Sequence, residues 1–382
     1  MTILPLILGL LAAFAPLAID MYLPALPAMA ASLGSNSAGA QLTIASYFLG
    51  MALGQLAYGP LTDRLGRKPP LLFGVALFVV ASLACALAQD MPQMIALRLL
   101  QALGGCAGMV VARAVVRDVA ELRDPVRLMA RLMLIMGVAP ILAPSLGGLL
   151  AEALGWRAIF VALALFGGVA LLLVVLALPE THPPARRLRQ TPAEILAAYG
   201  ALLADARFRR PALASSFGTA SMFAYIAGSP SVFMEVHSIA PGQYGLLFGV
   251  NAVGIIAGSQ LSGWLAQRWG REVLFGRVLV AMAVLALALV TLTLLDGPFS
   301  LLFAFLFCFI SLLGLLFPLG TVLGLAHFPR MAGTASALMG TLQFALGGVA
   351  GVALGVWHDG TGLPMVAAML GCVAAANWFW RR

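Results

Sequence analysis

Charged residues divide this chain into long uncharged stretches, and this pattern limits the possible fold more than any other feature. Segments 69–89, 132–151, 158–179, 211–234 and 360–380 contain no Asp, Glu, Lys or Arg. Each can cross a bilayer core of about 30 Å, for which a helix needs about 20 residues. Of the 382 residues, 62% are apolar and 9% are charged, too few polar groups to cover a soluble protein. We therefore expect an all-α membrane protein.

Turn-forming residues split the longer apolar stretches into further spans. Pro24 and Pro27 precede one break, and the sequence Asp296-Gly297-Pro298 marks another. The twelve expected spans, with approximate ends, are 3–24, 41–61, 70–89, 93–112, 128–150, 158–178, 211–234, 243–265, 273–295, 299–324, 332–356 and 362–380.

The basic residues predict the orientation of these spans. Twenty of the 22 lie at the C-terminus or in the connections on one side, Arg157 lies on the other side, and Arg98 lies within a span. Basic residues concentrate on the cytoplasmic side of membrane proteins, so both termini are expected in the cytoplasm. The same rule accounts for the net charge of +8 without a nucleic-acid partner.

The longest polar stretch, 180–210, separates the spans into two sets of six. We expect an N-terminal bundle at 1–179, a cytoplasmic linker at 180–210 and a C-terminal bundle at 211–382. Thr191 followed by Pro192 predicts the start of a short amphipathic helix in the linker, with a disordered tether as the alternative. A repeat supports the division, because the segments at 59–67 and 263–271 share Gly, Leu, Arg, Gly and Arg in register.

Several segments resemble signatures of the major facilitator superfamily, over nearly the whole chain. The sequence GPLTDRLGRK at 59–68 resembles its G-x-L-x-D-R-x-G-R-K motif, RLLQALGG at 98–105 its span 4 motif, and GVAPILAPSLGG at 137–148 its span 5 antiporter motif. The sequences IDMYLPALP at 19–27, PET at 179–181 and YIAGSP at 225–230 suggest the Bcr/CflA branch of bicyclomycin and phenicol exporters. This resemblance implies the major facilitator fold, with twelve transmembrane helices in two six-helix bundles.

The resemblance also implies a conformational latch after span 2. In the family, the acid that corresponds to Asp63 meets the N-terminus of span 11, here at 331–334, in the outward-facing state. A carboxylate at a helix N-terminus gains about 0.3–2 kcal/mol. The expected latch residues are Gly59, Asp63, Arg64, Gly66, Arg67, Lys68 and Asp118, where Asp118 or Glu121 pairs with Arg67 or Lys68. The alternative is a basic loop that only sets the topology.

A dense set of glycines and prolines in span 5 forms the antiporter motif. Prolines kink a helix and glycines admit close contact. The resemblance implies that this face packs on span 8 and limits leakage, whereas ordinary enrichment of Gly and Pro in membrane helices is the alternative. The expected residues are Gly137, Pro140, Pro144, Gly147 and Gly148.

Asp20 and Arg98 are ionisable residues expected inside the first and fourth spans. A charge at mid-membrane costs about 2.5–3.5 kcal/mol on insertion scales, so an acid there suggests a functional site. We expect Asp20 to carry the coupled proton and Arg98 to modulate it. The alternatives are that span 1 ends at Ile19, with Asp20 in water, and that Arg98 extends to the membrane surface.

Aromatic and amide side chains on several spans predict a substrate cavity with almost no fixed charge. Such walls suit amphipathic organic compounds, and ordinary helix packing is the alternative for each residue. The expected cavity residues are Tyr22, Tyr47, Gln55, Tyr58, Gln101, Phe223, Tyr225, Asn251 and Gln343.

Together these features predict proton-coupled efflux of amphipathic drugs or antibiotics across the bacterial inner membrane by alternating access. We expect a monomer whose partners are the substrate, protons and the lipid bilayer. No cofactor is expected, since the proton gradient supplies the energy. The sequence contains no P-loop, no metal-ligand set and no nucleophile elbow, so no motif suggests an enzyme. The alternatives are proton-coupled export of a sugar or small peptide, uptake by proton symport, and a non-transporting receptor.

Overall fold

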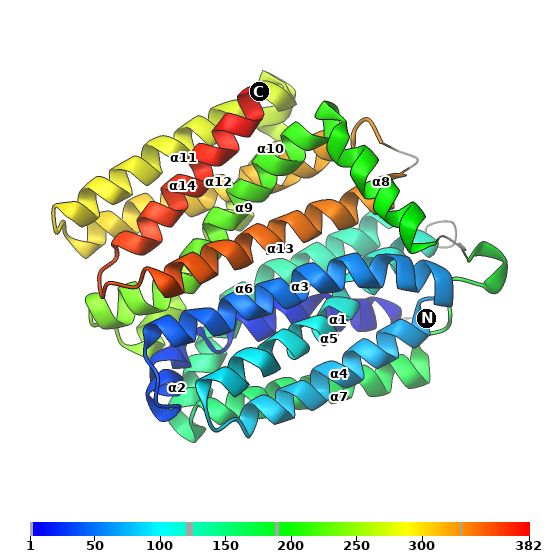
Figure 1. Ribbon diagram of the computed structural model, residues 1–382, viewed down its shortest axis with the longest axis horizontal. Helices are drawn as coiled ribbons and strands as arrows, with labels where there is room; N and C mark the ends of the chain where they lie inside the picture. Colours follow the sequence, from blue (N-terminus) through cyan, green and yellow to red (C-terminus); the bar gives the residue numbers. More distant parts are fainter. Residues whose placement is uncertain (1–2, 120–124, 188–190, 329–330) are drawn as a thin grey trace.

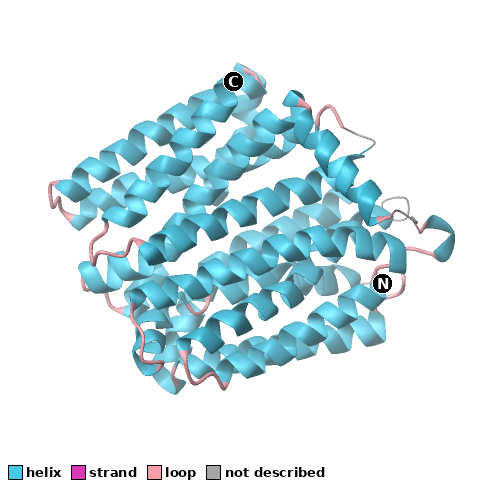
Figure 2. Cartoon of the chain, in the orientation of Figure 1, coloured by secondary structure: helices cyan, strands magenta, loops and turns pink. Residues whose placement is uncertain are grey.

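The computed structural model of the chain describes residues 3–119, 125–187, 191–328 and 331–382. Long helices make up most of this described part, and it contains no strand (Figures 1 and 2). Large apolar side chains point outward from the helices, with Phe73 65% exposed, Leu165 68% and Val284 63%. An apolar outer surface of this extent suits lipid and not water.

The first bundle contains the helices up to α7. α1 packs on α5, α6 and α7, while α4 packs on α5 and α7. Their bounds are α1 (Ile3–Asp20), α2 (Leu26–Ser32), α3 (Ser37–Leu65), α4 (Lys68–Ala86), α5 (Met91–Asp118), α6 (Pro125–Leu154) and α7 (Trp156–Ala177), with the 3-10 turn η1 (Leu23–Ala25) before α2.

The second bundle follows the 3-10 turn η2 (Pro184–Arg186) and the short helix α8. Its helices are α9 (Ala206–Pro230), continued by the π-helix η3 (Ser231–Val236), then α10 (Pro241–Trp269), α11 (Arg271–Leu294), α12 (Phe299–Leu325), α13 (Ala332–Val356) and α14 (Leu363–Arg381). The two bundles meet where α3 packs on α13 and α6 packs on α10. Functional side chains on these helices therefore lie near the boundary between the bundles.

The twelve expected spans correspond to α1, α3 to α7 and α9 to α14. By length and apolar composition, nine helices of the described part qualify as membrane spans, the first being Ile3–Ser32. α3 and α9 are not among the nine, and α6 contributes only its apolar stretch Val138–Leu154. α3 and α9 bury many polar side chains, among them Gln41, Gln55 and Ser215. These polar residues are protected inside the protein, so a span in such a position need not be uniformly apolar.

The predicted first span, 3–24, lies within the candidate membrane span Ile3–Ser32, but it is not one continuous helix. Helix α1 stops at Asp20, and the chain then turns through η1 before α2 begins at Leu26. Pro24 lies in this turn and Pro27 in the first turn of α2, and proline cannot donate the backbone hydrogen bond that a continuing helix requires. The alternative that placed Asp20 in water is also wrong, because the residue is only 4% exposed.

The linker contains the helix α8 (Pro192–Ala204), at the place where the sequence predicted a short helix. Thr191 forms a capping box, in which its side chain accepts from Glu194 N while the Glu194 carboxylate accepts from Thr191 N. Tyr199 and Leu202 are buried in one cluster with Phe208 of α9 and Leu338 of α13. α8 therefore lies against one end of the second bundle, the end at which both termini also lie (Figure 1). We call this the α8 end.

Candidate functional site

Asp20 is the last residue of α1 and lies inside the molecule. It is the one acidic residue in the buried set of the described part. No hydrogen bond or ion pair joins its carboxylate to another described residue. The charge of its carboxylate acts on the hydroxyl groups of three tyrosines, Tyr47 on α3, Tyr225 on α9 and Tyr244 on α10. The carboxyl group therefore sits among helices of both bundles.

Arg98 of α5 is fully buried and is held by aromatic rings and a backbone carbonyl. Its guanidinium lies 4.2 Å from the centre of the Tyr22 ring and 4.3 Å from that of Tyr47. Nη2 donates to the Ala18 carbonyl oxygen at 2.8 Å, and Nη1 donates to Gln101 Oε1. The faces of aromatic rings attract a cation, so these contacts stabilise the charge without a carboxylate.

Asp20 is the last residue of α1, and the guanidinium of Arg98 on α5 contacts the same end of α1. The two charges form no ion pair in the described conformation. Arg98 instead contacts the backbone two residues before Asp20. A cation is favoured near the carbonyl end of a helix. The arrangement allows a change in the position of α1 to alter the distance between the two charges.

A cavity of about 590 Å³ lies between the bundles and extends to α8. Gln55 of α3 and Gln343 of α13 line it from opposite bundles, and Tyr199 of α8 lines it at the α8 end. Gln55 is 3% exposed, and its Nε2 has no hydrogen-bond partner in the described part. An unpaired amide donor in a cavity wall is able to bind an acceptor oxygen of a ligand.

The other expected cavity residues occupy three different places. Tyr22, Tyr47 and Gln101 surround Arg98. The Tyr58 hydroxyl lies against Gly74 of α4, away from the cavity. Asn251 Nδ2 donates to the Tyr225 hydroxyl at 2.9 Å, within the second bundle. Of the nine expected residues, only Gln55 and Gln343 are among those that line the described cavity.

Phe223 belongs to a group of three phenylalanines that joins the bundles. The centre of its ring lies 4.2 Å from the ring centre of Phe48 on α3 and 5.2 Å from that of Phe344 on α13. Phe48 was not among the predicted site residues, because it occurs in an apolar stretch with no distinguishing motif. Its position, seven residues before Gln55 on the same helix, was the available signal.

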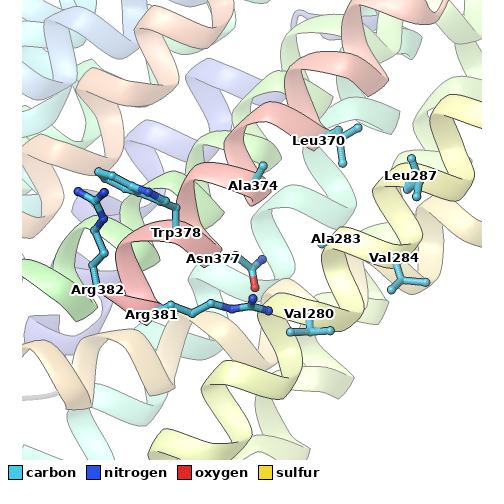
Figure 3. A pocket seen from close by; sticks show the side chains of 10 residues that line it. All are labelled: Val280, Ala283, Val284, Leu287, Leu370, Ala374, Asn377, Trp378, Arg381 and Arg382. Carbon is cyan, nitrogen blue, oxygen red and sulfur yellow. The ribbon is translucent and has the colours of Figure 1, made fainter.

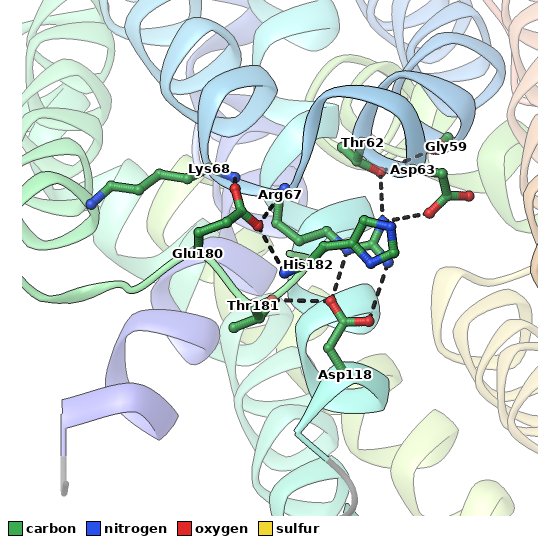
Figure 4. A network of polar contacts seen from close by, with 9 residues as sticks. All are labelled: Gly59, Thr62, Asp63, Arg67, Lys68, Asp118, Glu180, Thr181 and His182. Carbon is green, nitrogen blue, oxygen red and sulfur yellow. Dashed lines mark hydrogen bonds and ion pairs between the residues drawn. The ribbon is translucent and has the colours of Figure 1, made fainter. Parts of the chain in front are cut away.

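Arg67 forms the centre of the polar network at the α8 end (Figure 4). Its guanidinium donates to Asp118 Oδ2 through Nε at 2.8 Å and to Asp63 Oδ1 through Nη1 at 2.5 Å. Asp118 also accepts from the Thr181 hydroxyl at 3.0 Å. Arg67 therefore connects the end of α3 to the end of α5 and to the segment after α7.

The remaining latch residues have different surroundings. Arg64 is exposed, and Lys68 Nζ donates to the Val175 carbonyl oxygen instead of to an acid. Glu121, its other expected partner, lies outside the described residues. Gly59 and Asp63 line the cavity, as do Ala332, Gly333 and Thr334 at the start of α13. α3 is helical through Leu65, so the connection to α4 consists of Gly66 and Arg67.

Glu180 accepts hydrogen bonds from three backbone N–H groups, those of Arg67 at 2.9 Å, Lys68 at 3.1 Å and His182 at 2.9 Å. Gly66 has a φ of +94°, and a Cβ there would crowd the Glu180 carboxylate. Residues 179–181 resemble a family feature, but no role was predicted for Glu180. The carboxylate fixes the turn between α3 and α4.

The pKa of Glu180 is set by two opposing effects. Partial burial raises it, but hydrogen bonds from the N–H groups of Arg67, His182 and Lys68 outweigh burial and hold the pKa below its ordinary value. Its stabilising effect is therefore complete above the unfolded-state pKa of about 4.3. This effect is lost as the pH falls through the folded-state pKa.

Replacing Glu180 with Gln should therefore lower the melting temperature at pH 7 and change it little at pH 3. The measurement is thermal unfolding of the purified protein in detergent across this pH range. Glu194→Gln is the matched control, because Gln also completes a capping box. Equal losses for Glu180→Gln at both pH values would contradict the interpretation.

The antiporter motif of α6 packs on the turn after Asp20 and on α10. A Cβ at Gly147 would overlap the Met21 carbonyl oxygen, whereas a Cβ at Gly148 would lie 3.6 Å from its nearest neighbour, Pro241 O. Gly245 of α10 approaches Pro144 and Ser145 closely. Pro140 lies one turn earlier in α6, and Gly137 lies in the part of α6 whose side chains are outside the described set.

The bundles are in direct contact at the end opposite α8. Ser37 Oγ, in the first turn of α3, donates to the Glu235 carboxylate of η3, with oxygen distances of 2.5 and 2.7 Å. Gly351 of α13 lies against Ala45 of α3. The described conformation therefore has a cavity at the α8 end and packed side chains at the other.

The sequence profile of the Major Facilitator Superfamily matches residues 8–352. The chain belongs to the major facilitator superfamily. It is therefore a multi-pass membrane transporter and not an enzyme.

Several relatives of this major facilitator transporter are similar over most of the chain. It is 36% identical over 369 residues to the uncharacterized MFS-type transporter YdgK of Bacillus subtilis, covering 95% of this chain and 90% of the relative. It is 30% identical to the bicyclomycin resistance protein homolog of Haemophilus influenzae, covering 96% and 92%. A shorter match, 33% identical over 62% of this chain and 60% of the relative, is to the multidrug resistance protein MdtL of Escherichia coli.

Solved transporter structures share the fold of this major facilitator. A D-xylose-proton symporter superposes with a TM-score of 0.78 at 16% identity, covering 100% of this chain and 96% of that one. A bacterial homolog of the human lysosomal transporter Spinster gives a TM-score of 0.76 at 17% identity, covering 99% and 96%. At these identities the likeness establishes the fold alone.

Proposed function

We propose that this transporter exports amphipathic drug-like compounds from a bacterial cell in exchange for protons. It would act in the inner membrane with both termini and α8 in the cytoplasm. The observation that carries this proposal is Asp20, a buried carboxyl group without a cationic partner, placed among helices of both bundles. Such a group is able to bind and release a proton as its surroundings change.

The composition of the cavity wall supports an amphipathic substrate. Gln55 and Gln343 supply amide groups, while Val110, Leu325 and Met339 supply apolar surface. Asp63 also lines the cavity, eight residues beyond Gln55 on α3, where it belongs to the charged network of Arg67 and Asp118 (Figure 4). Two relatives are named for resistance to bicyclomycin or to multiple drugs, which supports the same substrate class.

Alternating access would use the two ends of the bundle interface. With α8 on the cytoplasmic side, the described conformation faces inward and is closed outside by Ser37 and Glu235. Movement of the bundles, 1–179 against 211–382, would bring Asp63 toward Ala332, Gly333 and Thr334. The carboxylate would then lie at the N-terminus of α13, where a negative charge is favoured. The cavity would open on the outside.

Proton exchange supplies enough free energy for this cycle. One inward-moving proton gains about 2.3 kcal/mol per 100 mV of membrane potential and about 1.4 kcal/mol per pH unit. A neutral drug exchanged for one proton uses both gradients. A monovalent cationic drug uses only the pH gradient, because the exchange moves no net charge.

The test uses inside-out membrane vesicles with an acidic interior and a pH-reporting dye. Phenicols, bicyclomycin, sulfonamides, quaternary cations, sugars and dipeptides are added separately. Drugs should release protons only from vesicles that contain the transporter, and vesicles from cells without it are the control. A response to sugars or dipeptides alone would replace the drug assignment with export of a metabolite. No response to any compound, with the protein present in the membrane, would contradict proton-coupled export of these classes.

A further inference from the structure

A groove of about 570 Å³ runs along the outer surface of the second bundle, between α11 and α14 (Figure 3). Val284 and Leu287 of α11, 63% and 58% exposed, form one wall, and Leu370 of α14 contributes to the other. The small side chains of Ala283 and Ala374 leave space between the walls. Both helices are membrane spans, so the groove faces the hydrocarbon interior of the bilayer.

Two arginines lie at one end of this apolar groove. Arg381 and Arg382 end α14, are exposed, and line the groove together with Trp378. The Arg382 guanidinium lies 4.0 Å from the Trp378 ring centre, and Arg381 extends toward Val280 and Asn377 (Figure 3). Neither arginine forms an ion pair in the described part of the chain. Trp and Arg at the end of a span are typical of the membrane surface.

Asn377 lines the groove, and both N–H groups of its side-chain amide already donate to backbone oxygens. Asn377 Nδ2 donates to the Leu279 carbonyl oxygen of α11 at 2.9 Å and to the Val373 carbonyl oxygen of α14 at 3.0 Å. These bonds hold the two helices at a set distance. The groove thus combines a fixed apolar channel with two cations at its membrane-surface end.

We propose that this groove binds an anionic phospholipid of the surrounding bilayer, with an acyl chain along α11 and α14 and the phosphate at the groove end where Arg381 and Arg382 lie. Arginine matches phosphate oxygens in a bidentate geometry. Basic pockets between membrane helices are suited to anionic lipid headgroups. The proposal does not depend on what the transporter exports.

A second copy of the chain fits this surface less well. A twofold axis normal to the membrane would place the same end of α14 from each copy at the same depth. The residues that line the groove include no acid, so Arg381 and Arg382 of the two copies would repel each other there. A lipid phosphate supplies the opposite charge and fits the open side of the groove.

The test measures lipid retention by native mass spectrometry of the purified full-length protein. The probes are dioleoyl phosphatidylglycerol and dioleoyl phosphatidylcholine, which have the same acyl chains. Phosphatidylglycerol should be retained about tenfold better, equivalent to about 1.4 kcal/mol. The double variant Arg381→Gln, Arg382→Gln should lose this preference, and Ala374→Trp should reduce retention of both lipids by filling the groove.

The matched control is the double variant Arg268→Gln, Arg277→Gln. These arginines also lie over tryptophans, Trp264 and Trp269, but they do not line the groove. The control should keep the preference for phosphatidylglycerol. Equal loss in the control, equal binding of the two lipids, full competition by inorganic phosphate, or a dimer abolished by Ala374→Trp would each overturn the proposal.

Discussion

Replacing Asp20 with Asn should abolish drug-triggered proton release in the vesicle assay while the protein remains folded. Asn has nearly the same shape as Asp but cannot bind or release the coupled proton. The site is 4% exposed and holds no ion pair in the described part, so the substitution breaks no ion pair there. We expect the response to fall at least tenfold, the change that corresponds to about 1.4 kcal/mol.

Two further variants make this prediction specific to the carboxyl group. Asp90→Asn is the matched control, because Asp90 is an exposed residue at the start of α5 whose side chain accepts from Gln93 N, a role that Asn also fills. Asp20→Glu keeps an ionisable group and should retain part of the response. Drug binding should persist in Asp20→Asn, because the substitution changes proton coupling and not the cavity wall. Gradient-dependent release by Asp20→Asn at the wild-type level would exclude Asp20 as the coupled proton site.

Gly147→Ala should strongly destabilise the transporter, whereas Gly148→Ala should leave it almost unchanged. A methyl group at Gly147 would overlap the Met21 backbone oxygen, which cannot move without shifting the turn after Asp20. Overpacking of this kind typically costs about 1–3 kcal/mol. At Gly148 the nearest atom to the added methyl group is 3.6 Å away, an ordinary contact.

The comparison is made by thermal unfolding in detergent and by drug-triggered proton release. Gly147→Ala should unfold several degrees below wild type and lose transport, because α6 is displaced from the chain segment that carries Asp20. Gly148→Ala should stay close to wild type in both measurements, since substitutions without a new clash typically change stability by about 0.5 kcal/mol or less. Equal stability of Gly147→Ala and Gly148→Ala would show that α6 does not pack on this turn as described.

The arrangement of spans and the linker helix were largely predictable because they follow from local chemistry. Uncharged stretches must be helical in a membrane, where backbone groups have no water to bind. Thr191, Pro192 and Glu194 specify the start of α8 through contacts within four residues. The break after Asp20 was the exception, since Pro24 signalled it but the apolar residues beside it favoured a continuous span.

The side chains of the site were less predictable, because helical spacing gives a face but not the neighbour that the face meets. Tyr58 and Gln55 are three residues apart on α3, yet Tyr58 contacts α4 and Gln55 lines the cavity. Tyr22 and Tyr47, which were predicted to meet substrate, lie over Arg98 in the described conformation. Phe48 was missed because nothing local distinguishes it from a lipid-facing residue.

The sequence by itself determined that this protein spans a membrane, where its helices lie and which residues carry charge within them. These properties depend on the transfer of each segment from water to lipid, a sum over neighbouring residues. Only the tertiary structure decided that Arg98 is held by aromatic rings, that Glu180 fixes the turn beside Arg67, and that Gly147 lies against Met21. Each of these contacts joins residues far apart in the chain, so its energy depends on how the helices pack.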